Sequence, residues 1–189
     1  MKLKTPISKD KVYKLKVGDI VYLTGRIYTG RDEAHLSIIR GEGREVVDKL
    51  KDGVIYHAGP IMKKIGERWK CVSIGPTTSA RMDEIEEDFI KVTAISAIVG
   101  KGGMKEDLLR TFKEYGVVYL AAPGGCAALL ADAVVEVKGV YLQELGMPEA
   151  IWELEVENFG PLIVAMDAQG RSIYQGVNRE VMEKLKELI

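Results

Sequence analysis

Short apolar segments that end at glycine constrain the fold of this 189-residue sequence more than any other feature. Val54 to Ala58 and Trp69 to Ile74 both end at a Gly-Pro pair, where the backbone must turn. Ala94 to Val99 and Val117 to Ala121 end at loops that are rich in glycine. Segments of this length and β-branched content, closed by turn residues, predict buried strands.

Segments with helical spacing lie between these strands. One begins at Asp32 after a strand over residues 20–28, another covers residues 105–115, and a third covers residues 79–90. Strands alone follow at residues 134–142, 151–156 and 159–167, with a hairpin partner at 172–175 and a last helix over 179–188. This order predicts an α/β fold with a mixed sheet, in a single domain that covers residues 1–189.

The charge balance argues against large anionic partners. The sequence contains 27 basic and 28 acidic residues, so no net positive field attracts nucleic acid or an anionic membrane. No apolar run approaches the roughly 20 residues that span a bilayer, and no apolar region follows Met1 as in a secretory signal. We therefore expect a cytoplasmic protein.

The two cysteines, Cys71 and Cys126, lie far apart in the sequence. Two thiols without a CxxC motif cannot supply the ligands of a zinc or iron–sulfur site, and a reducing compartment disfavours a disulfide. We expect Cys71 to be a small buried hydrophobic residue. Any cluster chemistry would therefore come from another chain.

Three junctions between a strand and a loop carry a cation beside glycines, namely those of Arg31, Arg81 and Lys101. Ligands of α/β sheets bind where loops converge beyond the carboxyl ends of strands, so we expect these cations in one crevice. Such a pocket suits a dianionic substrate, because arginine holds carboxylates through forked hydrogen bonds. A helix that starts near Thr78 is expected to add its free N–H groups and its dipole.

Each feature also has a simpler structural explanation. An arginine beside a turn is usually solvated, and Thr77 or Thr78 could serve only as a helix cap. His35 is more often a packed histidine than a ligand. The acidic run from Asp83 to Asp88 is most simply the solvated face of its helix.

The loop Gly100-Lys101-Gly102-Gly103 is similar to the GxxG loop of a KH domain, which clamps single-stranded RNA. A predicted strand rather than a helix precedes it, however, and the chain has no basic surplus. The loop also lacks the second half of a P-loop. An anion- or RNA-binding module without catalytic activity nevertheless stays the alternative function of a different class.

Six motifs together resemble those of the carboxy-terminal domain of class I (iron–sulfur) fumarate hydratases. In order they are TGRDEAH, DGVIYHAGP, SIGPTTSARMD, GKGG, APGGCAALL and WELEVENFGP, and they span residues 29–161. In single-chain members this domain follows a larger cluster-binding domain, whereas in many archaea and bacteria the two are separate subunits. The length of this chain matches the smaller, β subunit.

The resemblance implies a swivelling β/β/α domain with flanking helices that acts in an αβ heteromer, which can itself dimerise. It implies a [4Fe–4S] cluster held by three cysteines of the α subunit, and no metal bound by this chain. The substrate arginines of the family correspond to Arg31 and Arg81, and its loop lysine to Lys101. The hydroxyl proposed as its general base corresponds to Thr77, with Thr78 lining the pocket.

The reaction implied by the resemblance is reversible hydration of fumarate to (S)-malate. The cluster iron would act as Lewis acid on the hydroxyl, while this subunit removes the C3 proton. A free threonine hydroxyl is too weakly acidic for that role, so the neighbouring cations are expected to stabilise its alkoxide-like state. The β subunit of L-tartrate dehydratase has the same motifs and is the nearest enzymatic alternative.

Overall fold

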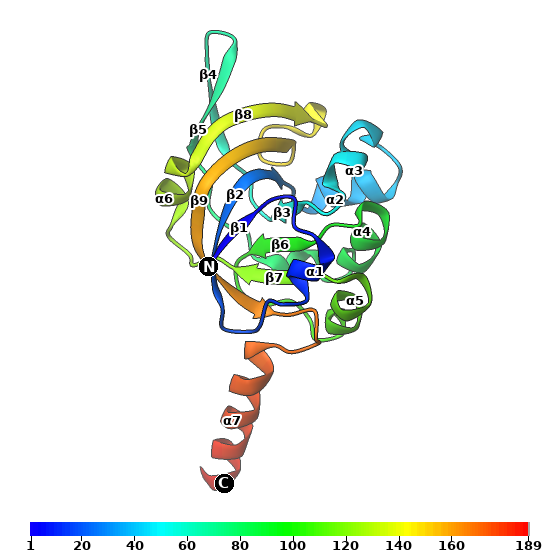
Figure 1. Cartoon of the computed structure of the whole chain (residues 1–189), viewed down its shortest axis with the longest axis vertical. Coiled ribbons are helices and arrows are strands. Elements are labelled where there is room, and N and C mark those ends of the chain that lie inside the picture. The colour runs from blue at the N-terminus through cyan, green and yellow to red at the C-terminus, as the bar shows by residue number, and fades with distance from the viewer. Residues whose placement is uncertain (189) are drawn as a thin grey trace.

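The computed structural model of the chain describes residues 1–188 and, within the last helix, every side chain except those of residues 178–180, 183, 187 and 188. Its seven-stranded sheet is mixed, and helices cover one side of it (Figure 1). A separate two-stranded hairpin extends away from the sheet (Figure 1). The predicted α/β class and mixed sheet are therefore confirmed.

The elements follow one another with short connections. The strands are β1 (Lys2–Lys4), β2 (Ile20–Thr29), β3 (Val54–Tyr56), β4 (Ile61–Ile65), β5 (Arg68–Ser73), β6 (Ala97–Gly100), β7 (Val118–Ala121), β8 (Val134–Tyr141) and β9 (Ile151–Met166). The α-helices are α1 (Lys9–Val12), α2 (Asp32–Ile39), α3 (Arg44–Leu50), α4 (Glu86–Thr93), α5 (Leu108–Tyr115), α6 (Ala127–Asp132) and α7 (Ile173–Leu188). The 3₁₀ turns are η1 (Ser79–Met82) and η2 (Gln143–Leu145).

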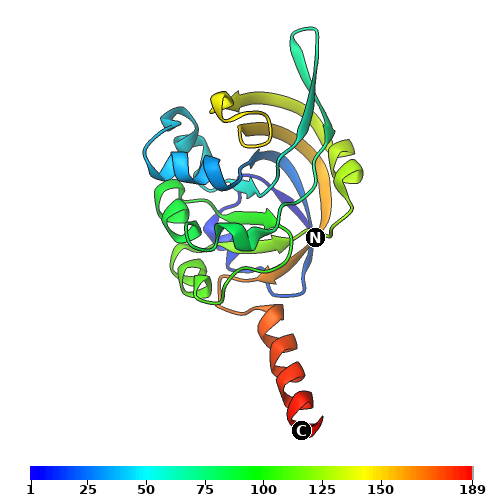
Figure 2. The ribbon, with the colours of Figure 1, turned by 180° about the vertical axis from the view of Figure 1, so that it is seen from behind.

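The long strand β9 closes the sheet into a ring. Strands β2, β3, β6 and β7 are parallel neighbours in that order, and β9 pairs antiparallel with both β7 and β2. Strand β1 extends the sheet beside β2, and β8 lies on the outer edge of β9. In Figure 1 the curvature of β2, β8 and β9 is visible, and α7 projects away from the ring in both views (Figures 1 and 2).

The central strands are apolar throughout because both of their faces are buried. In β3, Val54 and Tyr56 face the interior of the ring, whereas Ile55 faces the helices. In β7, Leu120 likewise faces the interior of the ring, and Tyr119 faces the helices. Because helices α2 to α5 cover the outer face, both faces of these strands are buried, and period-two polarity is absent. The same burial places the loops after these strands at one edge.

Three local predictions were wrong. Residues 79–90 form η1 and then α4 rather than one helix, because the backbone N–H of Ser79 donates to Lys101 O and so belongs to a strand-like pairing. The two strands predicted at residues 151–156 and 159–167 form the single strand β9, which keeps its pairing with β2 across two register shifts. The expected hairpin strand at 172–175 is the start of α7, with one bridge between Met166 and Ser172.

Because the ring encloses its own core, we expect loss of an aromatic contact inside it to destabilise the protein strongly. The ring of Phe159 in β9 is fully buried and meets Tyr56 edge-on, with centroids 5.3 Å apart. Phe159→Ala should lower the free energy of unfolding by about 3–5 kcal/mol, measured by urea denaturation. The exposed strand residue Val135 provides the control, since Val135→Ala should change it by less than about 0.5 kcal/mol. Equal effects of the two changes would contradict the closed ring.

Candidate active site

The loops after the parallel strands β2, β3 and β6 carry Arg31, His57 and Lys101 at the same edge of the sheet. The segment from Thr77 to Ser79 crosses that edge. The N–H of Thr77 donates to His57 O at 2.6 Å, and the N–H of Lys101 donates to Thr77 O at 3.2 Å. A parallel bridge joins Thr78 to Lys101. The predicted threonine and lysine residues are thus brought together by main-chain pairing.

Glycine is required where this pairing brings side chains close to the backbone. A Cβ atom on Gly100 would lie 1.8 Å from Ser79 Oγ and 3.0 Å from Tyr119 Oη. A Cβ atom on Gly59 would lie 3.1 Å from Arg31 Cδ and 2.8 Å from Pro148 O. Both contacts are too close for any side chain, so these glycines allow Ser79 and Arg31 to approach the edge.

Arg31 and Arg81 each have a carboxylate partner within this chain. Arg31 Nε lies 3.1 Å from Glu149 Oε1, and Glu149 Oε2 also accepts the N–H of Glu33 in the first turn of α2. Arg81 Nε donates to Asp32 Oδ2 at 3.0 Å. Burial opposes the charged form of Asp32, but the hydrogen bond from Arg81, a backbone hydrogen bond and the charges of Arg81 and Arg31 together outweigh it and lower the pKa of Asp32. Both guanidinium groups keep further N–H donors, so each can bind a second carboxylate.

The expected helix dipole beside Thr78 is absent. Helix α4 begins at Glu86, and Thr78 precedes only the 3₁₀ turn η1, without a side-chain capping hydrogen bond. Thr78 is exposed, whereas Thr77 is half-buried. The hydroxyl of Thr77 forms no hydrogen bond with another described residue. The predicted contribution of an α-helix terminus at Thr78 is therefore wrong.

Sequence reasoning missed a buried polar cluster below this edge, formed by His35, His57, Ser79, Glu86 and Tyr119. All five side chains are fully buried. Glu86 contradicts the prediction that the acidic run is solvated throughout. It shares one helix face with the buried Phe89 and Ile90, and that spacing was the available signal. His35 is packed, as the simpler explanation held, and its ring stacks on Phe89 at 3.9 Å.

The cluster has the residue types of a nucleophilic triad but not its accessibility. His57 Nδ1 lies 2.9 Å from Ser79 Oγ, and His57 Nε2 lies 3.3 Å from Glu86 Oε2. A nucleophile must reach substrate, and Ser79 is fully buried with its Oγ accepting the hydroxyl of Tyr119 at 3.0 Å. We therefore exclude acyl transfer at Ser79.

The thiols of this chain do not fit an iron–sulfur cluster. Cys71 lies in the core, as predicted, and burial raises the pKa of its thiol to about 11. Burial also raises the pKa of Cys126, whose Sγ contacts Pro123 O. A cluster needs several thiolates that converge, and neither cysteine belongs to a group of three converging ligand atoms among the described residues. Among the described residues, three potential ligand atoms converge only in His35, His57 and Glu86, within 4.8 Å of one another.

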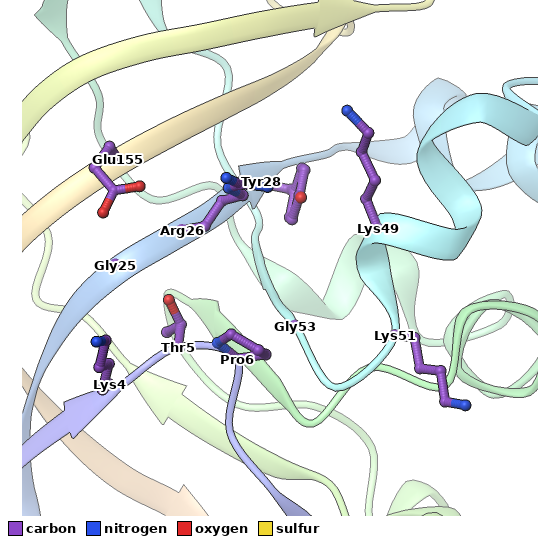
Figure 3. Close-up of a pocket in the computed structure, with 10 residues that line it drawn as sticks. All are labelled: Lys4, Thr5, Pro6, Gly25, Arg26, Tyr28, Lys49, Lys51, Gly53 and Glu155. Atoms are coloured by element: carbon purple, nitrogen blue, oxygen red, sulfur yellow. The ribbon is translucent and has the colours of Figure 1, made fainter.

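A cavity of about 380 Å³ on the opposite side of the ring is also rich in cations. Figure 3 shows that its lysines do not converge, since Lys49 and Lys51 extend in opposite directions. Arg26 and Lys49 are already paired with Glu153, at 3.1 and 3.4 Å. The cavity lies beside Gly53, before β3, and therefore away from the edge that carries Thr77. It is not a second candidate for a dianionic substrate.

Within residues 1–188, no helix is both long and apolar enough to cross a membrane.

Comparison with known proteins identifies the family. A family profile described as "Fumarase C-terminus" matches residues 1–177. The chain is 68% identical over 186 residues to the "Putative L(+)-tartrate dehydratase subunit beta" of Methanocaldococcus jannaschii, covering 97% of this chain and 95% of that protein. It is 43% identical over 174 residues to the L(+)-tartrate dehydratase subunit beta of Escherichia coli, covering 90% and 85%.

A longer relative shows the same region within a single chain. The chain is 41% identical over 186 residues to the "Putative fumarate hydratase class I" of Geobacillus stearothermophilus, covering 98% of this chain but 35% of that protein. The predicted resemblance is therefore confirmed across nearly the whole sequence. This chain belongs to the fumarase carboxy-terminal family, as the β subunit of a hydro-lyase of the fumarase or tartrate dehydratase type.

Proposed function

We propose that this chain supplies the substrate-binding cations and the general base of a two-subunit hydro-lyase that hydrates fumarate to (S)-malate. The observation that supports this most is the main-chain pairing that brings Thr77 and Thr78 against Lys101. The same edge carries Arg31 and Arg81, joined through the neighbouring residue Asp32. Cations from three loops beside a hydroxyl suit a substrate with two carboxylates.

In this proposal the two arginines orient the carboxylates of the substrate, and Thr77 removes the proton from C3. Thr77 is fixed by two main-chain hydrogen bonds, so its side chain is free to act. Loss of the C3 proton places negative charge on the adjacent carboxylate, and the charges of Arg31, Arg81 and Lys101 stabilise it. Those charges also favour the deprotonated form of the hydroxyl.

A [4Fe–4S] cluster is assigned to the partner α subunit, because the two cysteines here are too few to hold one and join no converging ligand set among the described residues. On the partner, such a cluster would supply a Lewis acid for the hydroxyl of the substrate. Free thiols at Cys71 and Cys126 fit a reducing compartment, and we place the enzyme in the cytoplasm.

L-Tartrate is the second candidate substrate, because two of the relatives carry the name of tartrate dehydratase. (S)-Malate and L-tartrate differ by one hydroxyl group, and a site built to bond that hydroxyl discriminates strongly against the compound that lacks it. The αβ complex, reconstituted anaerobically, should be assayed with (S)-malate and with L-tartrate under the same conditions. A kcat/KM at least tenfold higher for tartrate would show that the enzyme is a tartrate dehydratase and would contradict the proposed hydration of fumarate.

The isolated chain should be colourless, should hold no stoichiometric iron and should not hydrate fumarate. Anaerobic reconstitution with the cluster-bearing subunit should restore activity, measured by absorbance of fumarate and by iron analysis. Hydration of fumarate by this polypeptide alone would contradict the assignment of the cluster to a partner.

Arg81→Ala in the reconstituted complex should lower kcat/KM by about 100-fold or more, because a substrate carboxylate loses its forked partner in a closed site. Steady-state rates with malate and fumarate measure the change. Arg110 on α5 is also exposed and provides the control, since Arg110→Ala should leave the rate unchanged. A wild-type rate in Arg81→Ala would remove this residue from the site.

Thr77→Val should abolish exchange of the C3 proton of malate with solvent, and should lower kcat by about 10²–10⁴-fold. Thr77→Ser keeps a hydroxyl and should retain exchange at a reduced rate. Mass spectrometry of malate after incubation of each complex in deuterated water measures the exchange. Because both main-chain hydrogen bonds of Thr77 are independent of its side chain, neither change should disturb the fold. Wild-type exchange in Thr77→Val would exclude Thr77 as the base.

A further inference from the structure

Glu86 lies between two histidines directly below the candidate site. Its Oε2 is 3.3 Å from His57 Nε2 and 3.7 Å from His35 Nε2, and all three side chains are fully buried. Each residue comes from a different element, namely α2, the loop after β3 and the first turn of α4. A buried carboxylate without a counter-charge is strongly unfavourable, so the protons in this cluster must balance its charge.

The hydrogen bonds of His35 assign its protons. His35 Nδ1 lies 2.8 Å from the carbonyl oxygen of Arg31, which can only accept, so Nδ1 carries a proton. In a neutral ring the lone pair of Nε2 would then face the carboxylate of Glu86. A second proton on Nε2 removes that repulsion and makes His35 the cation that balances Glu86.

The hydrogen bonds of His57 assign the other tautomer. Ser79 Oγ accepts the hydroxyl of Tyr119 at 3.0 Å, so its own proton is free to be donated to His57 Nδ1 at 2.9 Å. His57 then carries its proton on Nε2, which faces Glu86 Oε2 at 3.3 Å. Burial lowers the pKa of His57, against the influence of Glu86, which agrees with a neutral ring.

Charge balance favours a proton over a metal ion in this cluster. Burial disfavours the charged form of Glu86, but the histidines outweigh it and lower its pKa to about 2. One carboxylate and one imidazolium sum to zero, whereas a divalent ion with two neutral histidines and one carboxylate leaves a sealed positive charge. A zinc ion would also draw all three ligand atoms to about 2.0–2.2 Å from itself and need a fourth ligand.

We propose that the His35–Glu86–His57 cluster is a positioning device that ties Arg31 and the Thr77–Ser79 segment to one buried carboxylate. The inference rests on the proposed function for its catalytic consequence. His35 fixes the carbonyl of Arg31, and the ring of His57 fixes Ser79. The main-chain oxygen of His57 also accepts the N–H of Thr77 at 2.6 Å. The substrate cation and the general base therefore share one rigid support.

Glu86→Gln is the sharpest test, because it keeps the shape of the side chain and removes its charge. His35 should lose its second proton, and the carbonyl of Arg31 and the N–H of Thr77 should shift. In the reconstituted complex kcat/KM should fall by about 10–100-fold, the scale expected from misplacing catalytic groups by up to about 1 Å. Glu87→Gln on the same helix is the matched control, since Glu87 pairs with Lys91 at the surface and does not belong to the histidine cluster.

Nitrogen-15 labelling of histidine measures the protons directly, because the sequence contains only two histidines. Ring spectra of the full chain should show one imidazolium and one neutral ring protonated on Nε2, and both rings should be neutral in Glu86→Gln. Amide signals of Arg31 and Thr77 should move in Glu86→Gln and stay in Glu87→Gln. These spectra need neither partner nor substrate. They therefore test the protonation of the histidines and their link to Arg31 and Thr77 even if the complex proves not to be a hydro-lyase.

Any one of four results would overturn the proposal. Two neutral rings in the unmodified chain would show that His35 does not balance Glu86. A stoichiometric divalent ion in the purified chain, measured by mass spectrometry, would replace the proton by a metal centre. Unmoved amide signals in Glu86→Gln, or a Glu86→Gln complex that unfolds more readily yet keeps the wild-type kcat/KM, would leave the cluster with a purely structural role.

Discussion

The antiparallel pairing of β9 with both β2 and β7 is the constraint on which the rest of the structure depends. Four parallel strands alone would form an open sheet with two unpaired edges, whereas β9 closes them into a ring with its own core. The pairing with β9 runs along β2 as far as Tyr28, next to the loop that carries Arg31. The loops after β3 and β6 then meet at the same edge.

Carboxylates of the chain itself organise the candidate site. Glu149 and Asp32 each bind one of the two arginines, and Glu86 binds the two histidines below them. A group of free cations would repel one another in a partly buried crevice, and internal anions reduce that repulsion. Glu149 and Asp32 are partly exposed and leave guanidinium donors of the arginines available, whereas Glu86 is fully buried. This difference separates groups that can meet a substrate from groups that can only support it.

Much of the fold and part of the site could be predicted from local pattern. Strands β2, β3, β6 and β7 were predicted within a few residues, because β3, β6 and β7 are apolar on both faces, β2 alternates, and each ends close to a turn residue. The break between η1 and α4 was missed, since it depends on a hydrogen bond from Ser79 to Lys101, far away in the sequence. Glu86 was misplaced for the same reason, because its partners lie in α2 and after β3.

By itself, the sequence determined the α/β class, the family and the residue types at the strand ends, because these follow from short-range periodicity and from motifs in a fixed order. The tertiary structure decided which of those residues meet. It paired Thr77 with His57 and Lys101, directed Arg81 to Asp32, and enclosed Glu86 between two histidines. Such contacts join distant parts of the chain, and only closure of the ring brings those parts together.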